Sequence, residues 1–237
     1  MPIEEVLCVS TELLHICGHF QGFMPLCSNY TPLFLEANQE FRPRDVVEDD
    51  PLIKQLIPYI IVERGGRLLN YYRGSGSGES RLRGNHSIGI GGHINPCDLT
   101  EAAIGRMANR PEILSDMYVR GLLRELNEEL RFKPRQEVWD IRLLGLINED
   151  ETSVGRVHLG AVHVLHTQVE CVAREEDVLE LDWNTHSALL TAMQEEDPEA
   201  DNAFELWSRI CLEHVPTLRR SPAKRLRSPH RVPREKN

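Results

Sequence analysis

The pattern of apolar and polar positions predicts both strands and helices along this chain of 237 residues. Short apolar runs predict strands at residues 5–10, 59–62, 68–72, 88–94, 139–147 and 157–166. Helices are predicted at residues 46–57, 113–132, 185–196 and 202–214, the first rich in charge and the last two amphipathic. This order of elements fits an α/β (α+β) fold in which helices cover a mixed sheet.

Glycines mark two of the predicted connections. The runs 59–62 and 68–72 flank Gly65 and Gly66, which predicts a β-hairpin. Residues 74–78 read Gly-Ser-Gly-Ser-Gly and are expected to form a flexible loop within the domain. The strand at 88–94 runs into the pair Gly91-Gly92, where backbone can approach a ligand closely.

The helix at 113–132 carries the most informative pattern in the chain. Its residues Glu125, Glu128 and Glu129 stand at positions i, i+3 and i+4, so their carboxylates share one face. The opposite face is an apolar stripe made of Leu122, Leu123, Leu126 and Leu130. The alternative interpretation of this pattern is an acidic helix face that is only solvated, which has a similar composition. The apolar stripe and the preceding glycine turn favour a site for a hard divalent cation, which prefers carboxylate oxygens.

The segment Arg124-Glu125-Leu126-Asn127-Glu128-Glu129, preceded by a Gly-Gly turn, resembles the box of the Nudix hydrolase superfamily. The similarity is greatest to the Nudix-like predicted phosphoesterases, which share a Gly-Gly-His turn and an extended box loop. In the box an acidic residue lies eight positions before the arginine, and here that position is Asp116. A small residue usually lies three before it, and here it is Gly121.

Two features depart from the box. It normally ends with a glycine before the last apolar residue, whereas this chain has Arg131 before Phe132. In addition, 32 positions separate Gly92 from Arg124, where the box has 14. We therefore expect an insertion at about residues 93–115, which a loop can accept because closure entropy grows slowly with length. Residues 99–108 within it look helical and could form a lid on the pocket.

The resemblance implies a Nudix-like α/β/α sandwich that hydrolyses phosphoanhydrides of the nucleoside diphosphate type. The cofactor would be Mg²⁺ or Mn²⁺, with Glu125, Glu128, Glu129 and the Gly91 or Gly92 carbonyl as metal ligands. Glu128 and Glu129 would carry catalysis, and Arg124 would hold the glutamate face by pairing with Glu125, Glu128 or Asp116. The alternative interpretation of Arg124 is that it forms an ordinary surface ion pair.

The general base is left open by the sequence. One of the box glutamates could serve, and so could a residue of the acidic linker Glu149, Asp150 and Glu151, although a solvated turn has the same composition. Residues 175–177 are weaker candidates of the same kind. His93 lies at the glycine turn. Two interpretations of it remain: a contact to a phosphate or a metal ion, or a loop residue without a chemical role. His158 and His163 fall at opposite parities of one strand and should face opposite sides of the sheet.

Charge divides the chain into two parts. Residues 1–218 hold 19 Lys/Arg and 36 Asp/Glu, a net charge of −17, whereas residues 219–237 hold eight Lys/Arg and one glutamate. We expect a single domain over residues 1–215 and a disordered basic tail over 216–237, rich in proline and poor in apolar residues. The acidic body argues against a nucleic-acid-binding surface on the fold itself.

The sequence also indicates where in the cell the protein is located. No segment approaches the ~20 consecutive apolar residues that a membrane-spanning helix needs. The N-terminus lacks the basic region and apolar run of a signal peptide. A cytoplasmic location and six reduced, scattered cysteines are therefore the expectation. The resemblance to the Nudix hydrolases implies a small nucleotide-like substrate. The remaining alternative for function is a catalytically inactive Nudix-fold module that binds a nucleotide or regulates a partner.

Overall fold

The computed structural model describes residues 3–73, 84–100, 105–135, 137–174, 179–197, 200 and 202–214. The predictions for the glycine-rich loop at 74–78, the acidic residues 175–177 and the basic tail lie outside the described residues, as do residues 101–104 of the lid helix expected at 99–108. None of the described helices is long and apolar enough to cross a membrane.

Most of the predicted elements are found in the structure, which also has several strands that the sequence did not predict. The strands are β1 Glu5–Ser10, β2 Gly22–Pro25, β3 Glu40–Pro43, β4 Ile53–Arg64, β5 Arg67–Arg73, β6 His86–Ser87, β7 Gly89–Gly91, β8 Arg106–Met107, β9 Leu130–Lys133, β10 Val138–Asn148, β11 His158–Thr167, β12 Glu170–Ala173 and β13 Leu179–Asn184. The α-helices are α1 Thr11–Gly18, α2 Arg44–Val47, α3 Asp116–Glu129, α4 His186–Glu195 and α5 Leu206–His214.

A mixed sheet forms the centre of the molecule. Its described strands run in the order β13-β5-β4-β11-β10-β2, and β4 and β11 at its middle are parallel. The predicted hairpin is confirmed, since β4 turns at Gly65 and Gly66 and returns as β5. Along the edge of β4 opposite to β11, β4 pairs first with β1, then with β7 and finally with β5. Pro58, which cannot donate a ladder hydrogen bond, lies between the first two of these segments.

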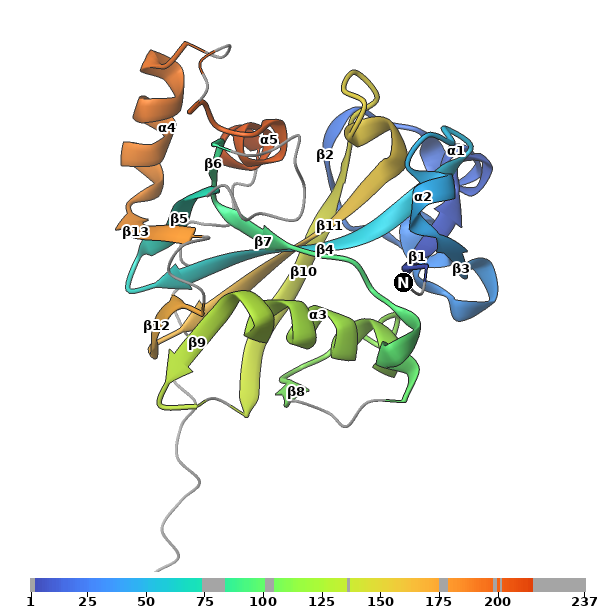
Figure 1. The fold of residues 1–237 in the computed structure, drawn as a ribbon, viewed down its shortest axis with the longest axis horizontal. Helices are drawn as coiled ribbons and strands as arrows, with labels where there is room; N and C mark the ends of the chain where they lie inside the picture. The colour runs from blue at the N-terminus through green and yellow to red at the C-terminus, as the bar shows by residue number, and fades with distance from the viewer. Residues whose placement is uncertain are drawn as a thin grey trace, which may run out of the picture.

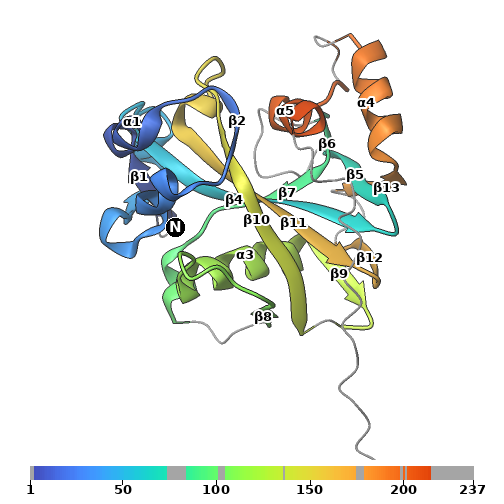
Figure 2. The ribbon, with the colours of Figure 1, turned by 180° about the vertical axis from the view of Figure 1, so that it is seen from behind.

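Helices cover both faces of this sheet, which confirms the expected α/β/α layering. Figures 1 and 2 show α3 along one face and α4 and α5 on the other. Two apolar cores correspond to the two faces, one beneath α3 and one beneath α4 and α5. Alternate residues of β11 enter the two cores, Leu159 and Leu165 toward α3 and Val162 and Val164 toward α5.

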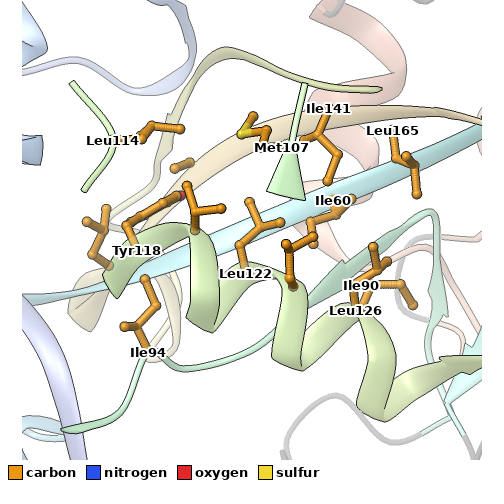
Figure 3. Packing of buried hydrophobic residues seen from close by; sticks show 14 of the residues in the cluster. Ile60, Ile90, Ile94, Met107, Leu114, Tyr118, Leu122, Leu126, Ile141 and Leu165 are labelled. Atoms are coloured by element: carbon orange, nitrogen blue, oxygen red, sulfur yellow. The ribbon is translucent and has the colours of Figure 1, made fainter. Parts of the chain in front are cut away.

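The apolar stripe of α3 packs on the sheet as its spacing predicts. Leu122, Leu123, Leu126 and Leu130 are at most 1% exposed. Figure 3 shows Leu122 and Leu126 pointing toward Ile60, Ile90 and Leu165 of the sheet. Burying each such side chain stabilises the fold by roughly 1.5–3 kcal/mol, which fixes the side of the helix that faces the core. The acidic residues are thereby left on the open side.

The predicted helix 113–132 is too long at both ends. Ser115 accepts a hydrogen bond from the backbone N–H of Tyr118 and caps the helix one residue before Asp116. At the other end Leu130 is extended, and β9 pairs with β12. Because the chain passes directly from helix to strand, it has no need of the glycine that normally ends the box, and Arg131 stands there exposed.

The charged helix predicted at 46–57 is wrong over most of its length. The structure has a single helical turn, α2, and Ile53 already begins the long strand β4. Every residue from Ile53 to Glu63 is buried. A strand that is buried on both faces shows no alternation, so its N-terminal half cannot be told from a helix by pattern.

The described part of the insertion does not form a lid. Met107 lies in the core beneath α3, and β8 adds to the edge of β10. Arg106 and Met107 are therefore extended, where the sequence predicts a helix. The insertion residues that the structure describes cover one end of α3 and close the core there.

Candidate functional site

A pocket of about 550 Å³ lies between the acidic face of α3 and the start of α5. Its size is within the usual range for sites that bind small molecules. Several segments distant in sequence meet there, among them the Gly91-Gly92 turn, the helix α3, the loop after β10 and the start of α5. Its charge is distinctive. Of the described residues that line it, five are glutamates and one is an arginine: Glu4, Glu125, Glu129, Glu149, Glu205 and Arg44.

The glycine turn allows the backbone to lie directly against a carboxylate. A Cβ atom built on Gly92 would stand 1.9 Å from Oε2 of Glu125, closer than any side chain could tolerate. Gly91 pairs with Tyr59 at the end of β7 and fixes where the turn begins. Glycine at 92 therefore leaves room for the Glu125 carboxylate, which a larger side chain there would displace.

The three glutamates of α3 are placed differently. Glu125 and Glu129, one helical turn apart, both line the pocket. The Glu125 side chain is 14% exposed and that of Glu128 is 57% exposed. Glu128 is not among the residues that line the pocket, and its carboxylate turns toward Arg124 at the rim.

Arg124 holds the acidic face of α3 in position through several hydrogen bonds. Its guanidinium donates to Oε1 of Glu125 at 2.7 Å and to Oε2 of Glu128 at 3.0 Å. It also donates to the carbonyl oxygen of His93 at 2.8 Å, which ties the helix to the glycine turn. The predicted pairing of Arg124 with Glu125 and Glu128 is thus found in the structure.

The predicted pairing of Arg124 with Asp116 is wrong. Asp116 is 71% exposed and pairs with Arg110 instead. The partner is Asp98, whose carboxylate accepts from Nε of Arg124 at 2.9 Å and from Nη2 at 3.0 Å, with only 1% of its side chain exposed. Counting back from the arginine gives Asp116, whereas counting forward from Gly92 by the box spacing gives Asp98. The inserted residues therefore follow Asp98.

Burial and charge act in opposite directions on this cluster. Burial raises the pKa of Glu125 to about 7, against the lowering effect of Arg124, and the nearby Glu128 and Glu129 add to the rise. Burial alone would lower the pKa of Arg124, but Asp98 and Glu125 outweigh it and raise that pKa. Since burial is the main cause of the raised pKa of Glu125, a cation bound beside this carboxyl would stabilise its charged form.

Glu149 reaches the pocket from the loop after β10, and only 5% of the residue is exposed. Its carboxylate accepts hydrogen bonds from the backbone N–H groups of Glu151 at 3.1 Å and Thr152 at 3.0 Å, and from the Thr152 hydroxyl. A solvated turn, the alternative interpretation of this linker, does not describe Glu149. A Cβ atom on Gly155 would meet its Oε1 at 1.5 Å, so that glycine makes room for it.

The loop that carries Glu149 is tied to the sheet by a buried lysine. Lys54 of β4, 1% exposed, donates to Oδ1 of Asp150 at 2.6 Å and to the carbonyl oxygen of Gly155 at 2.8 Å. Burial lowers the pKa of Lys54, and Asp150 partly offsets this. Burial would raise the pKa of Asp150, but Lys54 and His19 outweigh it and hold that pKa well below its usual range.

The histidines divide between the two faces of the sheet. His93 lines the pocket and shares a hydrogen bond of 2.8 Å with Gln55, and His158 lines it as well. His163 packs on the other face against Tyr118 of α3, 2.9 Å from its hydroxyl. Burial lowers the pKa of His163 to about 3, so it is a neutral core residue. The opposite orientation expected for His158 and His163 is confirmed.

The far wall of the pocket was not predicted from the sequence. Glu205, Leu206 and Trp207 of the α5 segment line it, together with Ile57 and Tyr59 of β4. The sequence places 202–214 in an amphipathic helix but gives no signal that its first turn faces a ligand. Contacts between a terminal helix and a central strand depend on the fold, which explains the omission.

The described residues hold no three His, Cys, Asp or Glu side chains that already converge on one point as metal ligands. In this arrangement Glu125 and Glu128 are both directed to Arg124. The donor set nevertheless suits a hard divalent cation, because it consists of carboxylates beside an open backbone turn with unbalanced negative charge.

Comparison with known proteins gives a consistent result, although no protein-family model matches the chain. Protein YmaB of Bacillus subtilis (strain 168) is 33% identical over 200 residues, covering 82% of this chain and 87% of that protein. The crystal structure of Tm1382, a protein provisionally assigned to the Nudix hydrolases, has 30% identity and a TM-score of 0.66. The match spans 90% of this chain and 98% of Tm1382. Together with the box helix and its glycine turn, this similarity shows that the chain belongs to the Nudix hydrolase family.

Proposed function

We propose that this protein is a metal-dependent hydrolase of phosphoanhydrides of the nucleoside diphosphate type. One observation carries the proposal: Glu125 and Glu129 of α3 and Glu149 of the loop after β10 line one pocket beside the Gly91-Gly92 turn. A diphosphate brings negative charge into a pocket that is already strongly acidic. Binding it therefore requires cations between the two.

The residues that would hold a divalent cation are Glu125, Glu128 and Glu129 with the Gly92 carbonyl. Mg²⁺ or Mn²⁺ in that position would neutralise the diphosphate and lower the pKa of a bound water. Glu125 and Glu128 would have to turn from Arg124, and Glu128 has the freedom to do so at its exposed position. Arg124 cannot lose its proton and would keep the helix face aligned with the turn.

Glu149 is the residue we assign as general base. Hydrogen bonds from the backbone N–H groups of the turn hold its carboxylate in place, and the residue lines the pocket together with Glu125 and Glu129 of α3. In the reaction a water oxygen forms a bond to phosphorus while the bond to the bridging oxygen breaks. Glu149 takes the proton of the water, and the departing phosphate keeps the electron pair of the broken bond.

The test is phosphate release from a panel of nucleoside diphosphate derivatives, measured with Mg²⁺, with Mn²⁺ and with a chelator. We expect turnover of at least one member with a divalent cation and none with the chelator. A protein that binds these compounds equally well with and without the cation, and cleaves none, would instead be the binding module considered above.

A further inference from the structure

The loop after β10, which carries the proposed general base, is held from inside the sheet at two points. Lys54 of β4 donates to Oδ1 of Asp150 at 2.6 Å and to the carbonyl oxygen of Gly155 at 2.8 Å. These two acceptors stand near the two ends of the loop, since β10 ends at Asn148 and β11 begins at His158. One ammonium group thus fixes both ends, and we call this pair of hydrogen bonds the loop clamp.

Glu149 lies directly against both ends of the loop. It precedes Asp150 in the sequence. A Cβ atom built on Gly155 would stand 1.5 Å from Oε1 of Glu149 and 2.5 Å from its carbonyl oxygen. Gly155 is therefore packed against the side chain and the backbone of Glu149 at once. Because no space separates the two residues, the position of the carboxylate follows the position of Gly155.

A chain of hydrogen bonds also joins Gly155 to this carboxylate. The backbone N–H of Gly155 donates to Oγ1 of Thr152 at 2.9 Å, and the Thr152 hydroxyl donates to Oε1 of Glu149. A hydroxyl has a single hydrogen to donate, so the bond that Thr152 accepts from Gly155 leaves that hydrogen directed at Glu149. Lys54 holds the carbonyl group of the same glycine. The ammonium is thus connected to the proposed base through two intervening residues.

The loop clamp is buried, whereas the contacts on the outer side of the loop are not. Lys54 is 1% exposed. Burial lowers its pKa, and the charges of Asp150 and Glu149 oppose that effect. On the outer side Asp150 contacts His19 and Gln21 at positions exposed to solvent, where water competes for the same hydrogen bonds. Hydrogen bonds of a charged group away from water are stronger, so Lys54 provides the larger part of the restraint.

We infer that Lys54 is a positioning residue for the hydrolysis, holding the Glu149 carboxylate at the place where it takes the proton of the attacking water. The inference rests on the proposed function, because it names what fixes the base of that reaction. Lys54 is not among the described residues that line the pocket. It acts through Asp150 and through Gly155 and Thr152.

The first test is a kinetic cycle with Glu149. Lys54→Met keeps an unbranched side chain and removes the charge. It should lower kcat by about 10- to 100-fold, the effect of a base displaced by about 1 Å, with KM and the Mg²⁺ requirement of the parent. In a protein that already has Glu149→Gln, it should lower kcat by less than about 3-fold further, because the residue through which it acts is missing.

Two further changes separate position from stability. Met193→Ala removes a buried core side chain of α4, 1% exposed, and should keep the kcat of the parent at a temperature where it is folded. Thr152→Val lies at an exposed position, so folding is not at risk, and it removes the hydroxyl between Gly155 and Glu149. It should lower kcat by about 10-fold, and Thr152→Ser, which keeps the hydroxyl, should restore most of the rate.

Hydrogen exchange measures the loop clamp without any turnover. The amide hydrogens of Glu151 and Thr152 bond to the Glu149 carboxylate, and that of Gly155 bonds to Thr152. All three should exchange at least about 10-fold faster in Lys54→Met than in the parent, because the loop opens more often. Amide hydrogens of the distant strand β5 should exchange at the same rate in both proteins.

Three results would overturn the inference and leave the proposed function intact. They are the kcat of the parent in Lys54→Met, a loss that multiplies fully with that of Glu149→Gln, and unchanged exchange of the loop amides. The multiplied loss would show that Lys54 acts on the structure at large and not through the base. Faster exchange in Lys54→Met, in a protein whose parent form hydrolyses nothing, would support the loop clamp and count against the hydrolase.

Discussion

At the scale of single residues, the buried pair of Arg124 and Asp98 does most to organise the site. It links the box helix to the segment just after the glycine turn, across 26 positions of sequence. The sequence predicts Arg124 as a positioning residue and names its partners Glu125 and Glu128, but its third candidate, Asp116, stands where the structure has Asp98. The reason is the insertion, which makes the two ways of counting the box give different residues. A spacing rule cannot say on which side of the acidic residue the extra chain lies.

Asp98→Asn and Asp116→Asn separate these alternatives by stability. Asp98→Asn leaves a buried guanidinium short of its counter-charge and should lower the free energy of unfolding by roughly 3–5 kcal/mol. Asp116→Asn loses an exposed ion pair and a favourable charge at the start of a helix, and should change the free energy of unfolding far less than Asp98→Asn. Denaturant unfolding measures both. Similar effects of the two changes would contradict the assignment of Asp98.

Glu149 supplies a second pair of matched substitutions. Glu149→Gln removes the proposed base and should lower kcat by about 10²–10⁴-fold. Glu151→Gln, two residues along the same loop and exposed, should behave like the parent enzyme. The melting temperature of Glu149→Gln shows whether the turn has survived, because its carboxylate also accepts backbone hydrogen bonds. Full activity in a folded Glu149→Gln protein would show that Glu149 is not the general base.

At the scale of elements, the loop after β10 depends on its tie to β4. Asp150→Asn leaves the buried Lys54 without its counter-charge. We expect a loss of roughly 2–3 kcal/mol in stability at neutral pH, less than for a wholly buried pair because Asp150 is partly exposed. Since the pKa of Asp150 is lowered on folding, its contribution is present above about pH 4 and lost as the pH falls below it. The variant should therefore show less loss of stability on acidification than the parent, measured by thermal unfolding across pH.

The insertion belongs to the core rather than to the pocket, as far as its residues are described. Met107→Ala should cost roughly 2–5 kcal/mol of stability, because the side chain is 7% exposed beneath α3. Leu99→Ala, at an exposed position of the same insertion, should change it by less than about 0.5 kcal/mol. At a temperature where both are folded, KM should match that of the parent. A raised KM for Met107→Ala would show that the insertion contributes to substrate binding.

Elements with strong periodicity or clear turns are those that the sequence predicts best. The box helix, the hairpin at Gly65-Gly66 and the strands β10 and β11 lie close to their expected bounds. The first half of β4 was misassigned, because burial on both faces removes the alternation that identifies a strand. The site follows the same logic: local spacing indicates Glu125 and Glu129, whereas Glu205 and Trp207 reach the pocket only through tertiary packing.

At the scale of the whole molecule, the sheet brings two chemically different walls to one pocket. One face of the sheet packs against the apolar stripe of α3 and the other packs against α5. The acidity of the pocket continues that of the whole body, whose net charge is −17 over residues 1–218. An anionic substrate can enter such a field only with cations, and this makes metal dependence the central claim.

The most direct measurement is the turnover of one nucleoside diphosphate derivative as Mg²⁺ is titrated into the parent protein and into Glu129→Gln. The parent should have no activity without Mg²⁺ and saturable activity with it. Glu129→Gln keeps the side-chain volume but loses a charge, so it should need more Mg²⁺ and lose about 10²–10⁴-fold in rate, or roughly 3–5 kcal/mol of transition-state stabilisation. Turnover that is independent of Mg²⁺, or a Glu129→Gln variant that matches the parent at every Mg²⁺ concentration, would contradict the account.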